Sequence, residues 1–127
     1  MLHHISLPVS DLVVSLRLYD SALEALGYRR VSSGVDFAGY GLEDGKDKFL
    51  IAVNEHENSV GKGFHLALAA PSRKAVDNFH KIALQFGALN NGNPGLREQY
   101  GPTYYAAFII DPDGHHIEAV INDQGAD

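Results

Sequence analysis

The chain contains an internal repeat, because a short apolar alternation that opens with histidine occurs twice, 61 residues apart. Residues 4–9 read His-Ile-Ser-Leu-Pro-Val, and residues 65–70 read His-Leu-Ala-Leu-Ala-Ala. Each segment leads into a polar helix start and an amphipathic run that ends at a glycine, Gly27 in the first half and Gly87 in the second. Two matches in the same order favour a duplicated unit over coincidence, and a duplicated unit restricts the possible folds.

In each half, the amphipathic run carries its apolar residues at the spacing of one helix face. The steps are 4, 3, 4 and 3 in the first run and 3, 4 and 3 in the second. The residues concerned are Leu12, Leu16, Tyr19, Leu23 and Leu26, and then Val76, Phe79, Ala83 and Phe86. The spacing predicts a first helix of about 15 residues and a second helix with Ser72 as its N-cap.

The ends of the two halves also match. Residues 37–53 align without gaps on residues 104–120, at an offset of 67. Within the second copy, the tetrapeptide Asp-Pro-Asp-Gly at 111–114 predicts a turn that joins two strands into a hairpin. The extra residues of offset fall in residues 90–100, which are rich in Asn, Gly and Pro and therefore predict a loop insertion.

Each half thus predicts a strand, a helix and then about three strands, so we expect an α+β fold of two βαβββ modules. Module 1 should span about residues 2–53 and module 2 about residues 64–122, with a polar linker at residues 54–63. A chain of 127 residues suits one domain of this kind, residues 1–127.

Side-chain alternation places the repeated histidines on the faces of their strands that carry small residues. His4 shares its face with Ser6, and His65 shares its face with Ala67. The opposite, apolar faces should pack against the helices. Small residues beside each imidazole leave room above it, as the floor of a binding site requires.

The last hairpin carries a carboxylate within an apolar run. Pairing Ile110 with His115 would put Glu118 on the same face as Tyr105 and His116. A buried carboxylate needs a positive partner, a proton or a metal, because burying the charge alone is costly. An exposed position at the edge of the sheet is the alternative for this residue.

Three repeat-equivalent positions therefore hold groups that can bind a metal, namely His4, His65 and Glu118, while the fourth such position holds Ile51. The chain has seven histidines and no cysteine, so a transition metal would have to be bound by imidazole and carboxylate. This donor set suits Fe(II), Mn, Ni, Co or Zn. Three protein ligands leave positions open for water or substrate, which is the catalytic pattern.

The charge of the chain argues against two classes of partner. The formal net charge is −6, from 16 acidic and 10 basic residues, and no basic run is present. We therefore expect neither nucleic-acid binding nor binding to an anionic membrane. No apolar run approaches the roughly 20 residues of a membrane helix, and the start of the chain lacks the pattern of a secretory signal. These features predict a cytoplasmic protein.

The motifs resemble those of the vicinal oxygen chelate superfamily, which includes glyoxalase I, extradiol dioxygenases, fosfomycin-resistance transferases and bleomycin-binding proteins. Residues 4–11, 64–68 and 111–118 carry the resemblance, and the last of these is a strand-turn-strand segment that ends in the glutamate. The resemblance extends over about residues 2–122. It implies paired modules that form an open, barrel-like mixed sheet around a divalent metal ion, with the helices on the outer face.

The resemblance further implies that His4, His65 and Glu118 hold the metal, and that a small-molecule substrate chelates it through vicinal oxygens. Glyoxalase I usually has a second glutamate at the position of Ile51, so at that position the chain is more similar to the dioxygenases and the fosfomycin-resistance transferases. We expect a metal-dependent enzyme whose reaction class is open between dioxygenase or transferase and glyoxalase-like lyase. The alternative is a non-catalytic binding or resistance protein on the same fold.

Assembly bears on the predicted site, because members of this size commonly form homodimers. His4 could then serve Glu118 of the same chain or Glu118 of a partner. The sequence leaves both arrangements open.

Two residues beside the predicted metal ligands are candidates for catalysis. Tyr105 could hydrogen-bond a metal-bound oxygen or act as an acid, or it could simply fill the sheet face. His116 could act as an acid or base near neutral pH, or it could lie exposed at the end of the hairpin. By the same alternation, Tyr104 should face the helices.

The predicted insertion supplies two candidate substrate-binding residues. Arg97 could pair with an anionic substrate, and Tyr100 could line the pocket. A solvated pair between Arg97 and Glu98 is the alternative. His56 and His80 belong to no cluster, and we interpret both as surface residues.

Overall fold

The two expected modules are present, each with the order strand, helix and three strands. The computed structural model describes residues 1–54, 60–61 and 63–124, so most of the expected linker, with His56, lies outside the described residues. Module 1 consists of β1 (Ile5–Val9), α1 (Leu12–Glu24), β2 (Arg29–Ser33), β3 (Phe37–Glu43) and β4 (Lys46–Val53). Module 2 consists of β5 (Leu66–Ala69), α2 (Arg73–Gln85), β6 (Leu89–Leu96), β7 (Tyr104–Ile110) and β8 (His116–Asn122).

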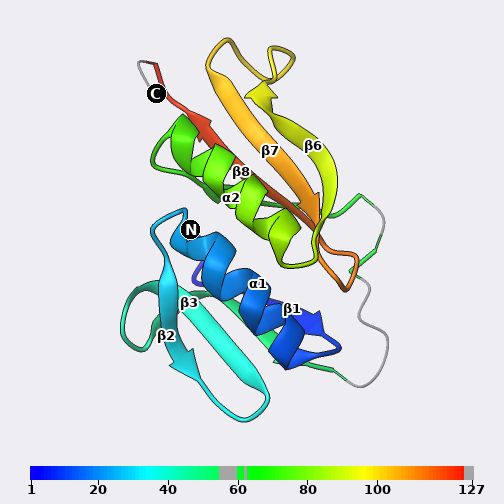
Figure 1. Ribbon diagram of the computed structural model, residues 1–127. Helices are drawn as coiled ribbons and strands as arrows, with labels where there is room; N and C mark the ends of the chain where they lie inside the picture. Colours follow the sequence, from blue (N-terminus) through cyan, green and yellow to red (C-terminus); the bar gives the residue numbers. More distant parts are fainter. Residues whose placement is uncertain (55–59, 62, 125–127) are drawn as a thin grey trace.

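Each module forms its own four-stranded mixed sheet, and the strand order is the same in both. The order is β1-β4-β3-β2 in module 1 and β5-β8-β7-β6 in module 2. In each sheet the first pair is parallel and the other pairs are antiparallel. The helices α1 and α2 pack against each other in front of the sheets (Figure 1). The α+β fold of two βαβββ modules is confirmed, and its described strands form two sheets rather than one.

Both helices begin at the expected polar residues, and the first is slightly shorter than the expected length of about 15 residues. The carboxylate of Asp11 accepts a hydrogen bond from the backbone N of Val14 at 3.3 Å, and the hydroxyl of Ser72 accepts one from the backbone N of Ala75 at 3.0 Å. These bonds satisfy N–H groups that the first helical turn leaves unpaired. Each helix has 13 residues. Gly27 and Gly87 follow the helices with positive φ values of 90° and 102°, where a side chain would be strained.

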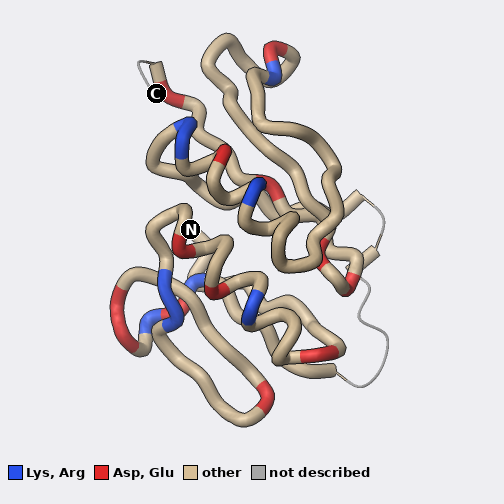
Figure 2. Tube along the Cα trace, viewed as in Figure 1, with Lys and Arg blue, Asp and Glu red and all other residues tan. Residues whose placement is uncertain are grey.

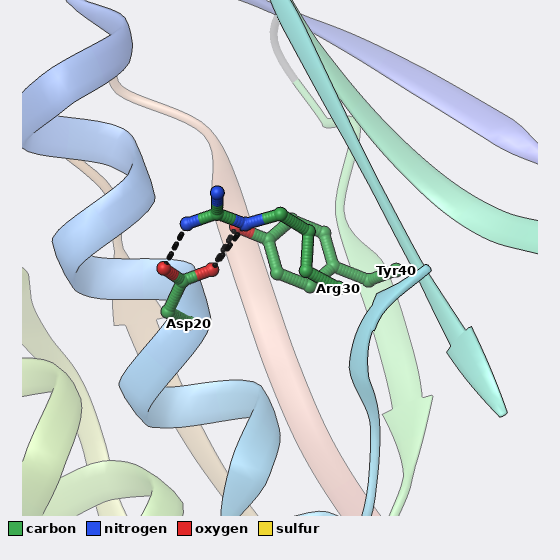
Figure 3. A network of polar contacts seen from close by, with 3 residues as sticks. All are labelled: Asp20, Arg30 and Tyr40. Atoms are coloured by element: carbon green, nitrogen blue, oxygen red, sulfur yellow. Dashed lines mark hydrogen bonds and ion pairs between the residues drawn. The ribbon is translucent and has the colours of Figure 1, made fainter. Parts of the chain in front are cut away.

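A network on module 1 joins its helix to two of its strands (Figure 3). Asp20 of α1 accepts hydrogen bonds from the Nε of Arg30 at 3.2 Å and from the hydroxyl of Tyr40 at 2.8 Å, and it also pairs with Nη2 of Arg30. Burial raises the pKa of Tyr40, and the hydrogen bond to Asp20 raises it further. The network therefore ties α1 to β2 and β3.

The turn between β7 and β8 ties module 2 to module 1. Asp111 in this turn accepts a hydrogen bond from the hydroxyl of Tyr19 on α1 at 2.6 Å. The ring of His115 donates from Nε2 to the carbonyl of Pro8 on β1, also at 2.6 Å, and the backbone N of Ser10 donates to Asp113 at 3.0 Å. Because Asp111 and His115 are both buried, the bonds of Asp111 to Tyr19 and of His115 to Pro8 are shielded from water.

The expected loop insertion at residues 90–100 is for the most part a bulged strand, which corrects the prediction. β6 continues to Leu96, and its pairing with β7 shifts register between Asn90 and Gly92 and again between Gly92 and Gly95. These bulges absorb residues that have no counterpart in module 1. The composition predicted a loop because no apolar alternation is present, but backbone pairing with β7 makes the segment a strand.

His80 is a second correction, because it is buried rather than on the surface. It lies on the inner side of α2, and its Nε2 donates to the side-chain oxygen of Asn90 at 2.9 Å. The same oxygen accepts a hydrogen bond from the backbone N of Gly92 at 2.9 Å. The buried ring therefore holds the first bulge of β6 against α2.

Charged residues are distributed over both modules rather than concentrated in one (Figure 2). Lysines and arginines stand singly or in small groups among acidic residues along the drawn trace. No helix within the described part of the chain is long and apolar enough to cross a membrane.

Candidate metal centre

Glu118 is a buried carboxylate in the middle of the second sheet. It lies on β8 between Ala67 of β5 and Phe108 of β7, and only 1% of its surface is exposed. The hydroxyl of Tyr104 donates to Oε2 of Glu118, and Nε2 of His65 lies 3.2 Å from Oε1. Burial of this charge is tolerated because both of its oxygens have partners.

A pocket of about 540 Å³ opens above this carboxylate. Its lining includes His65, Tyr100, Tyr104, Phe108, His116 and Glu118. The volume suits a small molecule, and a mainly aromatic wall with a few polar groups is typical of ligand sites. Tyr100 therefore lies at the pocket, as predicted, and its ring centre is 5.2 Å from that of Tyr104.

The expected register of β7 and β8 is wrong by one residue. Ile110 pairs with His116, not with His115, so Phe108 rather than Ala107 lies opposite Glu118. The reason lies in the turn, where the side chain of Asp111 accepts a hydrogen bond from the backbone N of His115 at 2.8 Å and so retains that residue in the turn. A slip of one residue moves every side chain of the partner strand to the other face.

The register exchanges the expected positions of two adjacent tyrosines. Tyr104, expected to face the helices, reaches the carboxylate of Glu118. Tyr105, expected beside Glu118, instead faces α2, where its hydroxyl donates to Asp77 at 2.6 Å and Arg73 lies over its ring. Tyr104 therefore occupies the catalytic position that was predicted for Tyr105. Burial and the hydrogen bond to Glu118 raise the pKa of Tyr104 to about 12.

His4 lies apart from the other two predicted ligands. It lines a separate, smaller cavity together with Ile5 and Leu66, and its Nδ1 lies 2.8 Å from that of His3. Within the described ranges of a single chain, no three His, Cys, Asp or Glu residues come close enough to hold one ion. The chain therefore brings His65 and Glu118 together but leaves His4 exposed and unconnected to them.

His116 lies at the mouth of the pocket. Its ring is exposed, as one of the two predicted alternatives states, and it also lines the pocket. Its Nδ1 is 3.5 Å from the side-chain nitrogen of Asn91 on β6. His116 is therefore accessible both to solvent and to a molecule in the pocket.

Arg97 is not among the residues that line the pocket, but it packs beside one of them, Phe108. Its guanidinium carbon is 5.3 Å from the ring centre of Phe108, and its Nη2 donates to the carbonyl of Asn93 at 2.6 Å. No ion pair with Glu98 is formed in the described structure. The alternative of a solvated Arg97–Glu98 pair is therefore wrong.

Comparison with known proteins gives relatives that cover nearly the whole chain. No family model matches the sequence. The chain is 30% identical to the uncharacterised protein YqjT of Bacillus subtilis, over 94% of this chain and 97% of that protein. A glyoxalase/bleomycin resistance protein from Albidiferax ferrireducens superposes with a TM-score of 0.81 at 30% identity, over 92% of this chain and 95% of that one. The chain belongs to the glyoxalase/bleomycin resistance family, within the vicinal oxygen chelate superfamily.

Membership in the glyoxalase/bleomycin resistance family confirms the resemblance predicted from the motifs. A glyoxalase I variant from Zea mays has the same fold, with a TM-score of 0.72 at 23% identity, and this chain covers 45% of it. The chain thus corresponds in fold to part of that longer protein.

The module 1 counterpart of Glu118 is Leu50 and not Ile51, which corrects the prediction. This is the position at which glyoxalase I usually has its second glutamate. The ungapped alignment assigns it to Ile51, but Ile51 is fully buried beside Leu7 on the helix side of its sheet. Glu118 pairs with Ala67, and the corresponding pair in module 1 joins Ser6 to Leu50. The structural counterpart of Glu118 is therefore Leu50, so either assignment leaves this position without a carboxylate.

Proposed function

We propose that the protein is a divalent-metal-dependent enzyme that acts on a small molecule chelating the metal through vicinal oxygens. The observation that carries the proposal is the buried carboxylate of Glu118, which shares a pocket with the imidazole of His65 at 3.2 Å. A carboxylate in an otherwise apolar strand is costly to retain unless its charge has a use.

His65 and Glu118 fit two positions in the coordination shell of a divalent ion. Imidazole nitrogen and carboxylate oxygen suit Fe(II), Mn, Ni, Co or Zn, and the absence of cysteine makes a thiolate site impossible. When bound, the ion would stabilise a substrate oxyanion as a Lewis acid or provide a site for oxygen activation. Tyr104 would orient the carboxylate through its hydrogen bond, as partners of metal ligands commonly do.

His4 would complete the site from a second copy of the chain. The isolated chain leaves His4 away from His65 and Glu118, which favours the partner arrangement over the same-chain arrangement. In the resulting homodimer, each site would combine His65 and Glu118 of one subunit with His4 of the other.

The reaction class favoured by the site is oxygenase or transferase chemistry rather than glyoxalase I chemistry. Leu50, the module 1 counterpart of Glu118, supplies no carboxylate, so the fourth ligand and base of a glyoxalase I is missing. His116 at the pocket mouth would accept or donate a substrate proton. A screen with catechols, fosfomycin and α-ketoaldehydes distinguishes these classes.

Metal analysis of the purified protein tests the proposal directly. We expect about one divalent ion per chain in the wild type, and much less in the Glu118→Ala and His65→Ala variants. A wild-type protein that takes up no metal would contradict the proposal and favour a non-catalytic binding protein on the same fold. Lys81→Ala, on the exposed side of α2, is a control that should retain the metal.

Mixing two inactive variants tests the shared site. A dimer of one His4→Ala chain and one Glu118→Ala chain contains one intact site if ligands are shared between subunits. Each variant alone should bind little metal, and the mixture should regain binding after subunit exchange. Failure to regain it in dimers that demonstrably exchanged subunits would place all three ligands in one chain.

A further inference from the structure

The side of β6 that faces the pocket has no side chains beside Phe108 and Ala106, because its residues there are glycines. Gly92 pairs with Phe108 and Gly95 with Ala106. A Cβ atom on Gly92 would lie 2.9 Å from Cδ2 of Phe108 and 3.2 Å from Nη2 of Arg97, and one on Gly95 would lie 3.2 Å from Nη1 of Arg97. The two glycines therefore make room for the guanidinium of Arg97 on this face.

The guanidinium is held in this position from several sides. Its Nη2 donates to the carbonyl of Asn93 at 2.6 Å, and its plane lies near the ring of Phe108. Asn93 is itself held by the side-chain nitrogen of Asn90 at 2.8 Å, and Asn90 is anchored to the buried ring of His80. The bulged strand thus fixes a cation before any ligand arrives, and such preorganisation lowers the entropic cost of binding.

Arg97 retains binding capacity in this position. A guanidinium has five N–H donors, and the described contacts of Arg97 go to two backbone carbonyls, those of Asn93 and Leu96. No carboxylate in the described ranges forms an ion pair with it. A fixed cation without an acidic partner beside an aromatic pocket is well suited to an anionic ligand.

The sheet orders the pocket groups in a row. Arg97 pairs through its backbone N with Tyr104 of β7 at 2.8 Å, and Phe108 of β7 pairs directly with Glu118 of β8. The cation therefore lies over β6 and β7, the aromatic rings over β7, and the carboxylate over β8. The guanidinium reaches back along β7 to the ring of Phe108, which pairs with Glu118. Neighbouring strands are about 4.8 Å apart, so the guanidinium and Glu118 are separated by about 10 Å across the sheet.

We propose that Arg97 is a specificity-determining residue that binds a carboxylate group of the substrate at the rim of the pocket. The inference rests on the proposed function, because it assumes that the other end of the substrate is bound near His65 and Glu118. The substrate class is then a small carboxylic acid whose carboxylate lies about two strand spacings from its metal-chelating oxygens, with its middle part over Phe108.

A matched pair of probes tests this inference on the purified protein. The probes are 3-phenylpropionate and its neutral amide, 3-phenylpropionamide, with binding followed by titration calorimetry and by NMR of the Arg97 Nε–H signal. We expect the acid to bind roughly tenfold or more tightly than the amide, and Arg97→Gln to remove this preference. The amide should bind the variant and the wild type within about twofold.

Arg73→Gln is the matched control, because it removes the same charge from the same module on the opposite face. Arg73 lies over the ring of Tyr105, which faces α2 and not the pocket. The control should retain the preference for the acid. An equal effect of both substitutions would mean that only net charge matters, and would overturn the proposal.

Three further outcomes would also overturn it. One is a wild-type protein that binds the acid no better than the amide. Another is Arg97→Gln weakening both probes equally, which would limit Arg97 to holding Phe108 in place. The third is acid binding that disappears in Glu118→Ala but persists in Arg97→Gln, because the acid would then be bound at the metal. If the wild-type protein takes up no metal but still prefers the acid over the amide through Arg97, only the proposed function is contradicted.

Discussion

Tyr104 on β7 donates its hydroxyl hydrogen to Oε2 of Glu118 on β8, so the buried carboxylate is oriented by the neighbouring strand. The next residue, Tyr105, makes a comparable bond to Asp77 on the opposite side of the same sheet. Adjacent tyrosines therefore serve different parts of the molecule, one the pocket and the other the contact between sheet and helix.

This pair provides a controlled test of metal binding. We predict that Tyr104→Phe lowers metal affinity by about 10- to 100-fold, because the carboxylate loses the partner that orients it. Tyr105→Phe should leave metal affinity unchanged and cost about 1 kcal/mol of unfolding free energy. Metal titration and urea unfolding of both variants measure these effects, and equal losses of metal affinity would contradict the assignment.

The contact between the modules should show a pH dependence through Asp111. Burial raises the pKa of this carboxyl, although the hydrogen bonds from Tyr19 and the backbone oppose the shift. The folded state thus holds the proton more tightly than the unfolded chain does. The stability that Asp111 contributes is fully present below its unfolded pKa, near 4, and is lost as the pH rises through its folded pKa.

Asp111→Asn removes this titration. We predict that the free energy of unfolding of the variant, relative to wild type, increases as the pH rises from about 4 to 7. Urea unfolding at a series of pH values measures the difference. Asp123→Asn, at an exposed position, should show no such trend. A difference for Asp111→Asn that is constant with pH would show that this carboxyl does not titrate in that range.

The buried ring of His80 should control the order of the β6 bulge. We predict that His80→Phe costs about 1 kcal/mol or somewhat more, because the side-chain oxygen of Asn90 loses a hydrogen-bond donor. Amide hydrogen exchange at Gly92 should become faster, since its N–H donates to the same oxygen. Unchanged exchange at Gly92 would show that the bulge holds its shape without His80.

Asp20 should act on module 1 mainly through Tyr40. The pair with Arg30 is partly exposed and should contribute less than about 1 kcal/mol, whereas loss of the partner of the buried Tyr40 hydroxyl should cost about 1–2 kcal/mol. Asp20→Ala therefore should destabilise more than Arg30→Ala does. Unfolding of the two single variants and the double variant measures the contributions, and a larger loss for Arg30→Ala would reverse the order.

The repeat was sufficient to predict the modules, because alternation and helix spacing are local properties of the sequence. His4 and His65 are exposed on the side of their segments opposite the apolar residues, as the alternation predicts, and Ser72 is the N-cap of the second helix. The same reasoning predicted Glu118 as a buried carboxylate near His65.

The errors arose where a side-chain hydrogen bond sets the backbone. Asp111 keeps His115 in the turn, which shifts the register by one residue and brings Tyr104 to Glu118. Asn90 and His80 stabilise a bulged strand from residues that predict a loop. The pattern of apolar residues carries no signal for either bond. A turn of five residues that begins at Asp111, rather than one of four, places Tyr104 correctly.

His115 and His116 are consecutive in the chain, yet their rings contact different parts of the molecule. The first is bonded to Pro8 of module 1, and the second lines the pocket of module 2. A single peptide unit therefore joins a buried contact between the modules to the wall of the pocket. A substitution at His115 would disturb both places at once, although only one of them is near the ligand.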